Sequence, residues 1–352
     1  MAKSIKYLVG VALILTLAGW VVVERGNRLD NMQGTPLEKV RVQAGWLLNG
    51  EFANVCSAIV NGYYEKRGLD VELVPGGPTG ASFVIATNAV ALDDSLTLGI
   101  DGDLVPLLRG KDSADLSKRI TVKAIGAFWN QNPFGFMVRE DSGLNSIKDF
   151  AKRKPDGSKY RIGVTADSVI QYAIAKYIGI PVENLDLVTV GFDASSFLSK
   201  QVDALAGYWT TQAYEAEKAG INYKFLPASE LPGFNQPSMI VVATQKTIAD
   251  RKNTLVKWFE ATIEGTRFVE QNPDVAAQEI LDPRCGGPSF DKDQEVWLIR
   301  KSIPLFDTTK PGWIYEAQVS GFTSAYQSLN QITRHPISSE LIDYSILNEI
   351  YQ

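Results

Sequence analysis

The sequence predicts an α/β protein of two lobes, joined by two hinge crossings and followed by a helical C-terminal part. Three observations support this prediction. Strand patterns alternate with helix patterns over residues 39–244, and such alternation gives sheets that are covered by helices. A second α/β set is inserted into the first, because a late strand returns to it. The remaining residues are mostly helical in pattern, and 352 residues suffice for two lobes of ordinary size.

The opening unit, residues 39–80, predicts a strand, a helix and a second strand. The first strand alternates apolar and polar residues and stops at Gly45. The second strand covers residues 69–75. The loop after the first strand carries Trp46 and Asn49, and it lies at the carboxyl edge of the sheet, where α/β proteins bind ligands. The apolar positions of the helix, three and four residues apart, are Phe52, Val55, Cys56, Ile59, Val60 and Tyr63.

The rest of the first set contains two further helices and two further strands. The strand at 96–100 ends at Asp101-Gly102-Asp103. The strand at 120–128 runs into Asn132-Pro133, a turn signal that we interpret as the first crossing between lobes. The two helices are predicted at 80–90, entered through Gly-Pro-Thr-Gly, and from 104 to about 108.

The second set spans residues 134–235 and has the same alternation. Its strands are predicted at 160–164, 185–190, 204–208 and 223–226, and its helices at 166–178, 195–201 and 210–219. Asp167 and Ser168 suit the start of the first of these helices, because both side chains accept from free backbone N–H groups. Residues 232–237 predict the return crossing, and the strand at 239–244 rejoins the first lobe. Lobe 1 is therefore predicted to comprise 38–133 and 236–352.

The C-terminal part is predicted to be helical. Residues 254–271 carry apolar side chains at helical spacing. Pro273 opens another helix, since proline is favoured at the first helical position. Further helices are predicted at 291–303 and 313–330.

Composition excludes some classes of function. The net charge is −5 with a pI near 5.2, and no basic stripe is present, so the sequence does not predict a nucleic-acid-binding protein. The only two cysteines are Cys56 and Cys285. A disulfide between them is open in an exported protein. We favour two separate buried thiols, because Cys56 lies on the apolar face of its helix.

The N-terminal residues 1–30 are predicted to be a signal peptide or an N-terminal membrane anchor. Lys3 and Lys6 precede an uncharged apolar run from Tyr7 to Val23. The run is at the short limit for a membrane span. It has no clear cleavage motif, and no cysteine for a lipid anchor follows it. A cleaved signal and a retained anchor are both open, and either predicts a periplasmic or otherwise extracytoplasmic location.

The chain resembles a known family in several motifs. Trp46-x-x-Asn49, followed by the run GYYEKRGLDVELVPGG at 62–77, is similar to the opening of the NMT1/THI5-like substrate-binding proteins of ABC importers, which are close to the sulfonate- and taurine-binding proteins. The resemblance extends through 131–133, 202–204 and 207–210. It implies a type II periplasmic binding protein fold, a small-molecule ligand, a membrane permease as partner and a monomer.

The sequence gives little support for catalysis, and it predicts no enzyme, no metal and no cofactor. It has no Cys/His/carboxylate cluster with metal-ligand spacing. Its single histidine, His335, lies in a polar tail region. Residues 76–80 lack the Gly-Lys-Ser/Thr ending of a phosphate-binding loop. Asp101 and Asp103 have three interpretations: acid/base groups, capping groups of a turn, or acceptors for a ligand N–H, which we prefer as a function.

Aromatic side chains follow the predicted strand ends and give the clearest indication of a site: Trp46, Phe128, Trp129, Phe134, Tyr208 and Trp209. Rings in such positions hold a flat ligand by stacking, and a few polar groups fix its orientation. The predicted ligand-binding residues are Trp46, Asn49, Phe52, Asp101, Trp129, Gln131, Asn132, Asp167, Ser168, Tyr208, Trp209 and Thr210.

The character of the predicted cleft favours a neutral, flat ligand. Its loops contain almost no Lys or Arg, which favours a thiamin-precursor pyrimidine or a flavin-like molecule over a sulfonate. A sulfonate- or taurine-type binding protein is one alternative. A pyrimidine-biosynthesis enzyme of the THI5 type is another, although the resemblance then implies a cysteine cluster and a catalytic histidine that this chain lacks. A membrane-tethered ligand sensor is the third.

Overall fold

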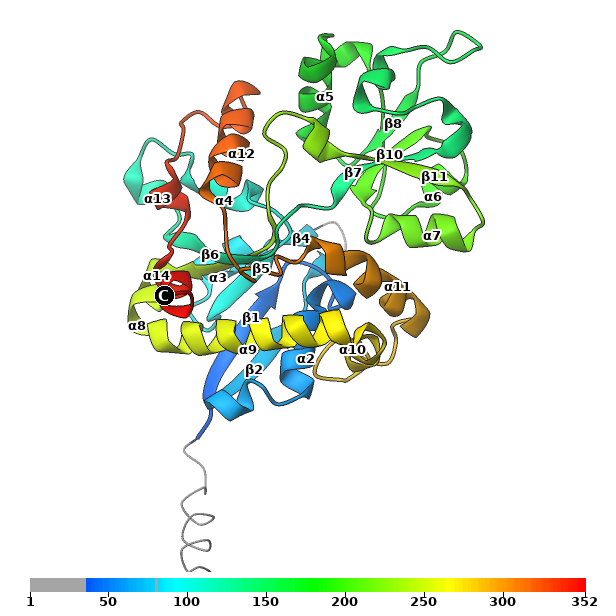
Figure 1. The fold of residues 1–352 in the computed structure, drawn as a ribbon. Coiled ribbons are helices and arrows are strands. Elements are labelled where there is room, and N and C mark those ends of the chain that lie inside the picture. The colour runs from blue at the N-terminus through cyan, green and yellow to red at the C-terminus, as the bar shows by residue number, and fades with distance from the viewer. Residues whose placement is uncertain (1–35, 80–81, 167) are drawn as a thin grey trace, which may run out of the picture. The chain divides into compact units, whose positions relative to one another are not determined.

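The computed structural model describes residues 36–79, 82–166 and 168–352, and residues 39–352 form one compact unit. The predicted N-terminal signal or anchor and Asp167 lie outside the described residues. Within the compact unit, two five-stranded sheets carry helices on their faces (Figure 1). This is the predicted α/β class with a helical C-terminal part.

The first sheet has the strand order β2-β1-β5-β12-β6. Strands β1 and β5 are parallel, whereas β12 runs antiparallel to both β5 and β6, so the sheet is mixed. The strands are β1 Glu38–Ala44, β2 Leu69–Val74, β5 Leu98–Asp101, β6 Val122–Trp129 and β12 Ser238–Thr244. The strand predicted at 239–244 therefore rejoins the first set, next to β5, as expected.

The second sheet has the order β11-β7-β10-β8-β9 and is also mixed. Strands β8, β9 and β10 are parallel, while β7 pairs antiparallel with β10 and β11. Its strands are β7 Phe134–Arg139, β8 Arg161–Val164, β9 Asp186–Thr189, β10 Ala204–Tyr208 and β11 Tyr223–Pro227. Strand β7 was not predicted, because its apolar run follows Asn132-Pro133 so closely that it was included in the crossing.

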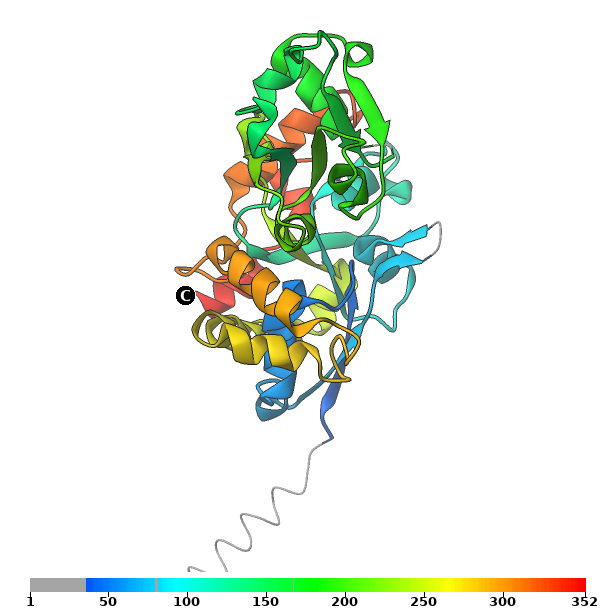
Figure 2. The same ribbon diagram turned by 90° about the vertical axis from the view of Figure 1, so that its right-hand side faces the viewer.

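The chain passes between the sheets twice, after β6 and again before β12. The two passages touch, because the Asn132 N–H donates to the carbonyl of Gln236 at 2.9 Å. Figure 2 shows residues of the second sheet, in green, placed above the first. The exact lobe limits, 38–133 with 236–352 and 134–235, stay a prediction.

Most helices follow the predicted segments. Helix α9 lies beside α2 under the first sheet (Figure 1), and Gly265 of α9 allows close approach to α2, since a Cβ there would meet the Asn54 carbonyl. Around the first sheet and at the C-terminus lie α2 Ala53–Val60, α3 Ala86–Leu92, α4 Val105–Lys111, α8 Gln245–Asp250, α9 Lys252–Gln271, α10 Pro273–Ile280, α11 Lys292–Ser302, α12 Glu316–Ser328, α13 Ser338–Leu341 and α14 Ser345–Ile350. In the second set lie α5 Ile170–Ile178, α6 Ser195–Leu198 and α7 Gln212–Lys218.

The helix predicted at 80–90 was placed too early. β4 Ser82–Val84, which pairs with β3 Gly77–Thr79 in a short hairpin, lies in the first part of that segment, and the helix α3 begins only at Ala86. A side chain from a later strand determines where α3 begins. The Asp101 carboxylate accepts from the N–H groups of Ala86 at 2.8 Å and Thr87 at 2.7 Å, and a helix begins where its free N–H groups find acceptors.

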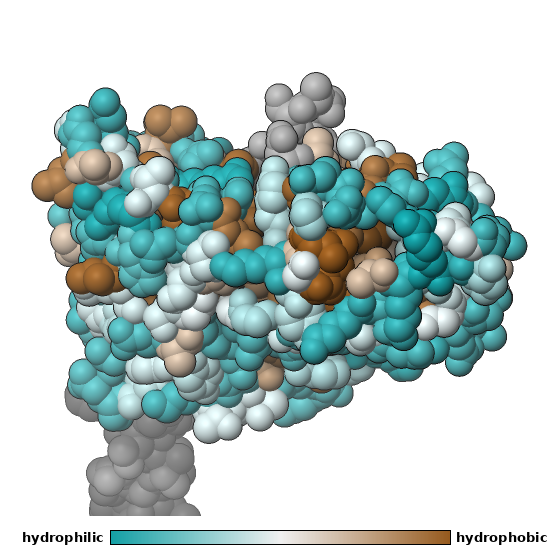
Figure 3. All heavy atoms as spheres, turned by 90° about the horizontal axis from the view of Figure 1, so that it is seen from above, coloured by the Kyte–Doolittle hydropathy of each residue, from teal (hydrophilic) through white to brown (hydrophobic). Residues whose placement is uncertain are grey.

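The surface mixes apolar and polar side chains. The face seen from above carries hydrophobic groups among hydrophilic ones (Figure 3). Among the described residues, no helix has both the length and the apolar character needed to cross a membrane. Within the described part of the chain, the exposed large apolar side chains are Leu37, Leu47, Leu92, Leu116, Tyr172, Phe192, Val275, Tyr315 and Ile337.

Candidate functional site

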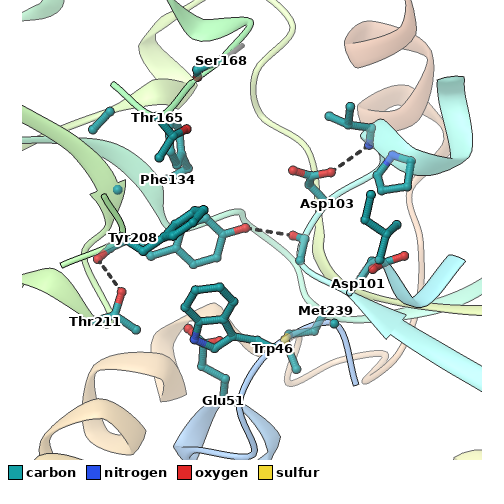
Figure 4. Close-up of a pocket in the computed structure, with 18 of the residues that line it drawn as sticks. Trp46, Glu51, Asp101, Asp103, Phe134, Thr165, Ser168, Tyr208, Thr211 and Met239 are labelled. Atoms are coloured by element: carbon teal, nitrogen blue, oxygen red, sulfur yellow. Dashed lines mark hydrogen bonds between the residues drawn. The ribbon is translucent and has the colours of Figure 1, made fainter. Parts of the chain in front are cut away.

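A cavity of about 470 Å³ lies where strand ends of both sheets meet (Figure 4). The first sheet contributes the turn after β1 and the end of β5. The second contributes the end of β10 and the loops after β8 and β9. The lining side chains include Trp46, Glu51, Phe52, Asp101, Asp103, Arg109, Phe134, Ser168, Phe192 and Tyr208. The cavity is therefore built from segments that are far apart in sequence.

Aromatic rings form two of its walls. Trp46, just after β1, and Phe192, after β9, meet edge to face with ring centroids 5.6 Å apart. Tyr208, the last residue of β10, contacts Phe134 in the same manner at 6.0 Å. Both Trp46 and Tyr208 are partly exposed and face the cavity (Figure 4). A flat ring between them would gain stacking as well as burial of apolar area.

One carbonyl connects the two sheets beside the cavity. The oxygen of Gly102 accepts from the Tyr208 hydroxyl at 3.1 Å, from the Asn132 amide at 3.2 Å and from the Ser238 hydroxyl at 2.5 Å. Tyr208 belongs to the second sheet, whereas Gly102 follows β5 of the first. Burial raises the pKa of Tyr208 well above its usual value, so the hydroxyl keeps its proton and donates. This cluster joins the first crossing, at Asn132, and the start of β12, at Ser238, to the rim of the cavity.

A buried acid, Glu51, forms the floor of the cavity beneath Trp46 (Figure 4). Burial, together with the nearby carboxyl of Glu295, raises its pKa from 4.5 to about 7. Among the described residues, only the Thr210 hydroxyl donates to it, at 3.4 Å. Glu295 of α11 accepts from the Gly50 N–H at 2.5 Å, and burial also raises its pKa to about 7.

Asp101 and Asp103 lie on the side facing the first sheet. Asp101 is buried, and desolvation raises its pKa although the Thr87 side chain and two backbone N–H groups donate to it. Asp103 accepts from the Val105 N–H at 2.8 Å, and burial raises its pKa to about 6. Both carboxyl groups thus cap helix starts, and they also border the cavity.

The lining is richer in acids than in bases. Glu51, Asp101 and Asp103 contribute three carboxyl groups. Among the described residues that line the cavity, Arg109 is the only lysine or arginine. Such a site suits a ligand that donates N–H groups or carries positive charge better than one with an anionic head.

Five of the predicted ligand-binding residues line the cavity: Trp46, Phe52, Asp101, Ser168 and Tyr208. Six others do not. Asn49 caps the turn before α2 by accepting from the Glu51 N–H. The Thr210 hydroxyl donates to the Glu51 carboxyl. Gln131 and Asn132 belong to the crossing, where Gln131 donates to Ser229. Trp129 and Trp209 pack into or against the core of the first sheet instead of facing the cavity.

The site also contains residues that the sequence did not predict there. Glu51 lies two residues after Asn49, so its position at a helix start near a strand end was a usable signal. Phe192 follows β9 in a polar loop, and Arg109 lies inside α4, so nothing local marked either one. Met239 of β12 and Tyr326 of α12 also line the cavity. Only the packing of these elements brings the two side chains there.

Comparison with known proteins agrees with this architecture. A sequence profile described as NMT1/THI5 like matches residues 49–276. The chain belongs to this family. Two curated proteins are similar to this NMT1/THI5-like chain. A formylaminopyrimidine-binding protein of Halalkalibacterium halodurans is 25% identical over 258 residues, which are 70% of each protein. A putative thiamine biosynthesis protein of Haemophilus influenzae is 22% identical over 280 residues, 78% of this chain and 82% of that protein.

Solved structures share the fold. The periplasmic aliphatic sulphonate binding protein SsuA of Escherichia coli matches with a TM-score of 0.60 and 13% identity, covering 87% of this chain and 92% of SsuA. The desulfurization enzyme DSZB matches with a TM-score of 0.58 and 13% identity, covering 89% of this chain and 98% of the enzyme. This NMT1/THI5-like chain therefore has the fold of periplasmic binding proteins, which an enzyme also uses.

Proposed function

We propose that this protein is an extracytoplasmic solute-binding protein of an ABC importer, and that it captures a small, flat, N–H-rich heteroaromatic molecule of the aminopyrimidine class. The observation that carries the proposal is the cavity itself, which has aromatic walls at Trp46 and Tyr208 and a carboxyl group, Glu51, on its floor. A binding site of this kind recognises a planar base by stacking and by accepting from its edge.

The chemistry assigns a role to each group. The rings of Trp46 and Tyr208 wall the two faces of the ligand. The Glu51 carboxylate accepts from an exocyclic amino group or a protonated ring nitrogen. Such a charge-assisted bond is stronger than one between neutral groups. A sulfonate is less favoured, because it would add a further negative charge near Glu51 and Asp103 with only Arg109 to oppose it.

The family supports transport over catalysis. A relative of the chain carries the name of a formylaminopyrimidine-binding protein, and a structural neighbour is a sulphonate-binding protein. DSZB shows that the fold does not by itself exclude an enzyme. The one histidine of this chain, His335, hydrogen-bonds Gln327 and does not line the cavity. We therefore propose ligand binding without turnover.

Delivery to a membrane permease requires export and closure. The apolar run from Tyr7 to Val23 behind Lys3 and Lys6 supports export. The two crossings, at 132–135 and 233–237, are the positions where hinge bending would bring the aromatic walls together. A fusion of residues 1–38 to a reporter that is active only outside the cytoplasm tests the export step. A fusion that stays in the cytoplasm would contradict an extracytoplasmic location.

Calorimetric titration with formylaminopyrimidine, a plain aminopyrimidine, riboflavin and an alkanesulfonate tests the ligand class. We expect dissociation constants between nanomolar and low micromolar for an aminopyrimidine, and no product after long incubation. Tight binding of the sulfonate alone, or steady turnover of any compound, would overturn the proposal.

A variant of the floor residue makes the test specific. Glu51→Gln should weaken aminopyrimidine binding about 10-fold or more at about pH 8, where the carboxyl is ionised, because bonds to charged groups contribute about 1.5–3 kcal/mol. Glu72→Gln is the matched control, because Glu72 is exposed and pairs with Arg41 far from the cavity. Equal affinities of the two variants would remove Glu51 from the site.

A further inference from the structure

The only two cysteines of the chain lie together in the core of the first sheet. Cys56 is in the middle of α2 and has no exposed surface, whereas Cys285 follows α10 and is 7% exposed. Both are free thiols in this structure. The sequence favoured two separate buried thiols, because Cys56 lies on the apolar face of its helix.

Contacts on both sides hold the two cysteines opposite each other. Next to Cys56, the Ser57 hydroxyl hydrogen-bonds the Glu279 carboxyl of α10, and Asn61 donates to the same carboxyl at 2.8 Å. Next to Cys285, Gly286 lies against the chain just before α2, since a Cβ there would fall 2.4 Å from the Leu48 carbonyl oxygen. Helices α2 and α10 therefore pack with a fixed register at this point.

The two thiols also influence each other. Burial and the neighbouring Cys285 raise the pKa of Cys56 well above its usual value. Because Cys56 and Cys285 share one core and the contacts beside each of them fix α2 against the segment that follows α10, little backbone movement is needed to join the two thiols.

We propose that Cys56 and Cys285 form a disulfide bond in the exported protein. The proposal rests on the export step of the proposed function, because disulfides form and persist in oxidising compartments outside the cytoplasm. The disulfide would close a loop of roughly 230 residues, and constraining a loop of that length removes much of the entropy of the unfolded chain.

The oxidant is an external disulfide, RSSR, such as oxidised glutathione or a thiol oxidoreductase in its disulfide form. One protein thiolate attacks RSSR, which gives a mixed disulfide and one RSH. The second thiolate then attacks the protein sulfur of the mixed disulfide and displaces the second RSH. The protein loses two electrons and two hydrogens, and RSSR gains them. Because both thiols are buried in the folded protein, exchange takes place during folding, before α10 packs on α2.

The disulfide would also stabilise the floor of the cavity. Helix α2 begins just after Glu51, and the segment after Cys285 leads into α11, whose Glu295 holds the Gly50 N–H. Joining Cys56 to Cys285 therefore ties together the two elements that position Glu51. The structure thus assigns the disulfide to the scaffold of the binding site.

The test uses the full chain, purified after export and also refolded from the reduced, unfolded state with oxidised and reduced glutathione. We expect a mass about 2 Da below that of the reduced chain and no free thiol under denaturing conditions. Proteolysis without reductant should release one cross-linked pair of peptides. A strong reductant should lower the melting temperature by about 5–10 °C.

Cys285→Ser and Cys56→Ala are the control variants, and reductant should leave the melting temperature of each unchanged. Two free thiols in the exported protein, or refolding that yields only glutathione adducts, would overturn the proposal. A disulfide that forms on refolding while the 1–38 fusion stays in the cytoplasm would refute export and still support the pairing. The two proposals therefore fail separately.

Discussion

Replacing two tryptophans separates the binding site from the core. Trp46 is partly exposed at the cavity, where its ring meets Phe192. Trp129 ends β6, has no exposed surface and does not line the cavity. The sequence placed both at strand ends and predicted both as ligand walls. The structure predicts that Trp46→Ala weakens ligand binding, while Trp129→Ala mainly destabilises the fold.

The magnitudes follow from burial. A tryptophan buries 150–250 Å² at about 25 cal/mol per Å², which sets an upper limit of roughly 4–6 kcal/mol. Trp46 also packs against the hydrophobic core of the first sheet. Only about half of the area of its side chain is therefore available to a ligand. We expect a loss of about 2–3 kcal/mol in affinity, or about 30- to 150-fold. For Trp129→Ala we expect about 3–5 kcal/mol in the free energy of unfolding.

Calorimetric titration and thermal melts of both variants give the answer. Trp129→Phe is a matched control, because it keeps an aromatic ring and removes an indole N–H that has no partner among the described residues. It should therefore destabilise the fold less than Trp129→Ala. A large loss of stability with unchanged affinity for Trp46→Ala would move Trp46 from the site to the core. Weakened binding with normal melting for Trp129→Ala would move Trp129 from the core to the site.

Three further predictions concern the polar groups. The pKa of Glu51 is raised from 4.5 to about 7 in the folded protein, so its ionisation destabilises the fold as pH rises through that window, by an amount on the order of 3 kcal/mol. Glu51→Gln should melt higher than wild type at about pH 8 and nearly equally at about pH 4, and parallel pH profiles would contradict this. Tyr208→Phe removes the hydrogen bond to Gly102. The loss of a bond of about 1 kcal/mol should weaken ligand binding about 5-fold, and small-angle X-ray scattering should show a more open average form. Unchanged affinity and unchanged scattering would argue against a link between the sheets. Asp101→Asn removes one hydrogen-bond acceptor from the start of α3, where the Thr87 N–H donates. In thermal melts it should lower the free energy of unfolding by about 1–2 kcal/mol. An unchanged melting temperature would show that the cap is dispensable.

Much of the fold was predictable because its signals are local. Strand β10 lies at the predicted residues 204–208, and Pro273 begins α10 as expected. Both depend on residues within a few positions of each other. The start of α3 was not predictable in this way, because the acceptor that fixes it, Asp101, belongs to a strand that comes later in the chain. Local patterns cannot show a cap supplied from another element.

The sequence by itself determined the α/β class, the insertion of the second strand set, the family motifs and the aromatic residues that follow strand ends. The tertiary structure alone decided which of those aromatics face the cavity: Trp46 does, and Trp129 does not. It also decided that Glu51 lies on the cavity floor and that Cys56 and Cys285 share one core. The reason is physical. Periodicity and turn signals depend on neighbours in the chain, whereas a cavity or a pair of thiols arises where distant segments pack, and only the packing of all the elements sets which side chains meet.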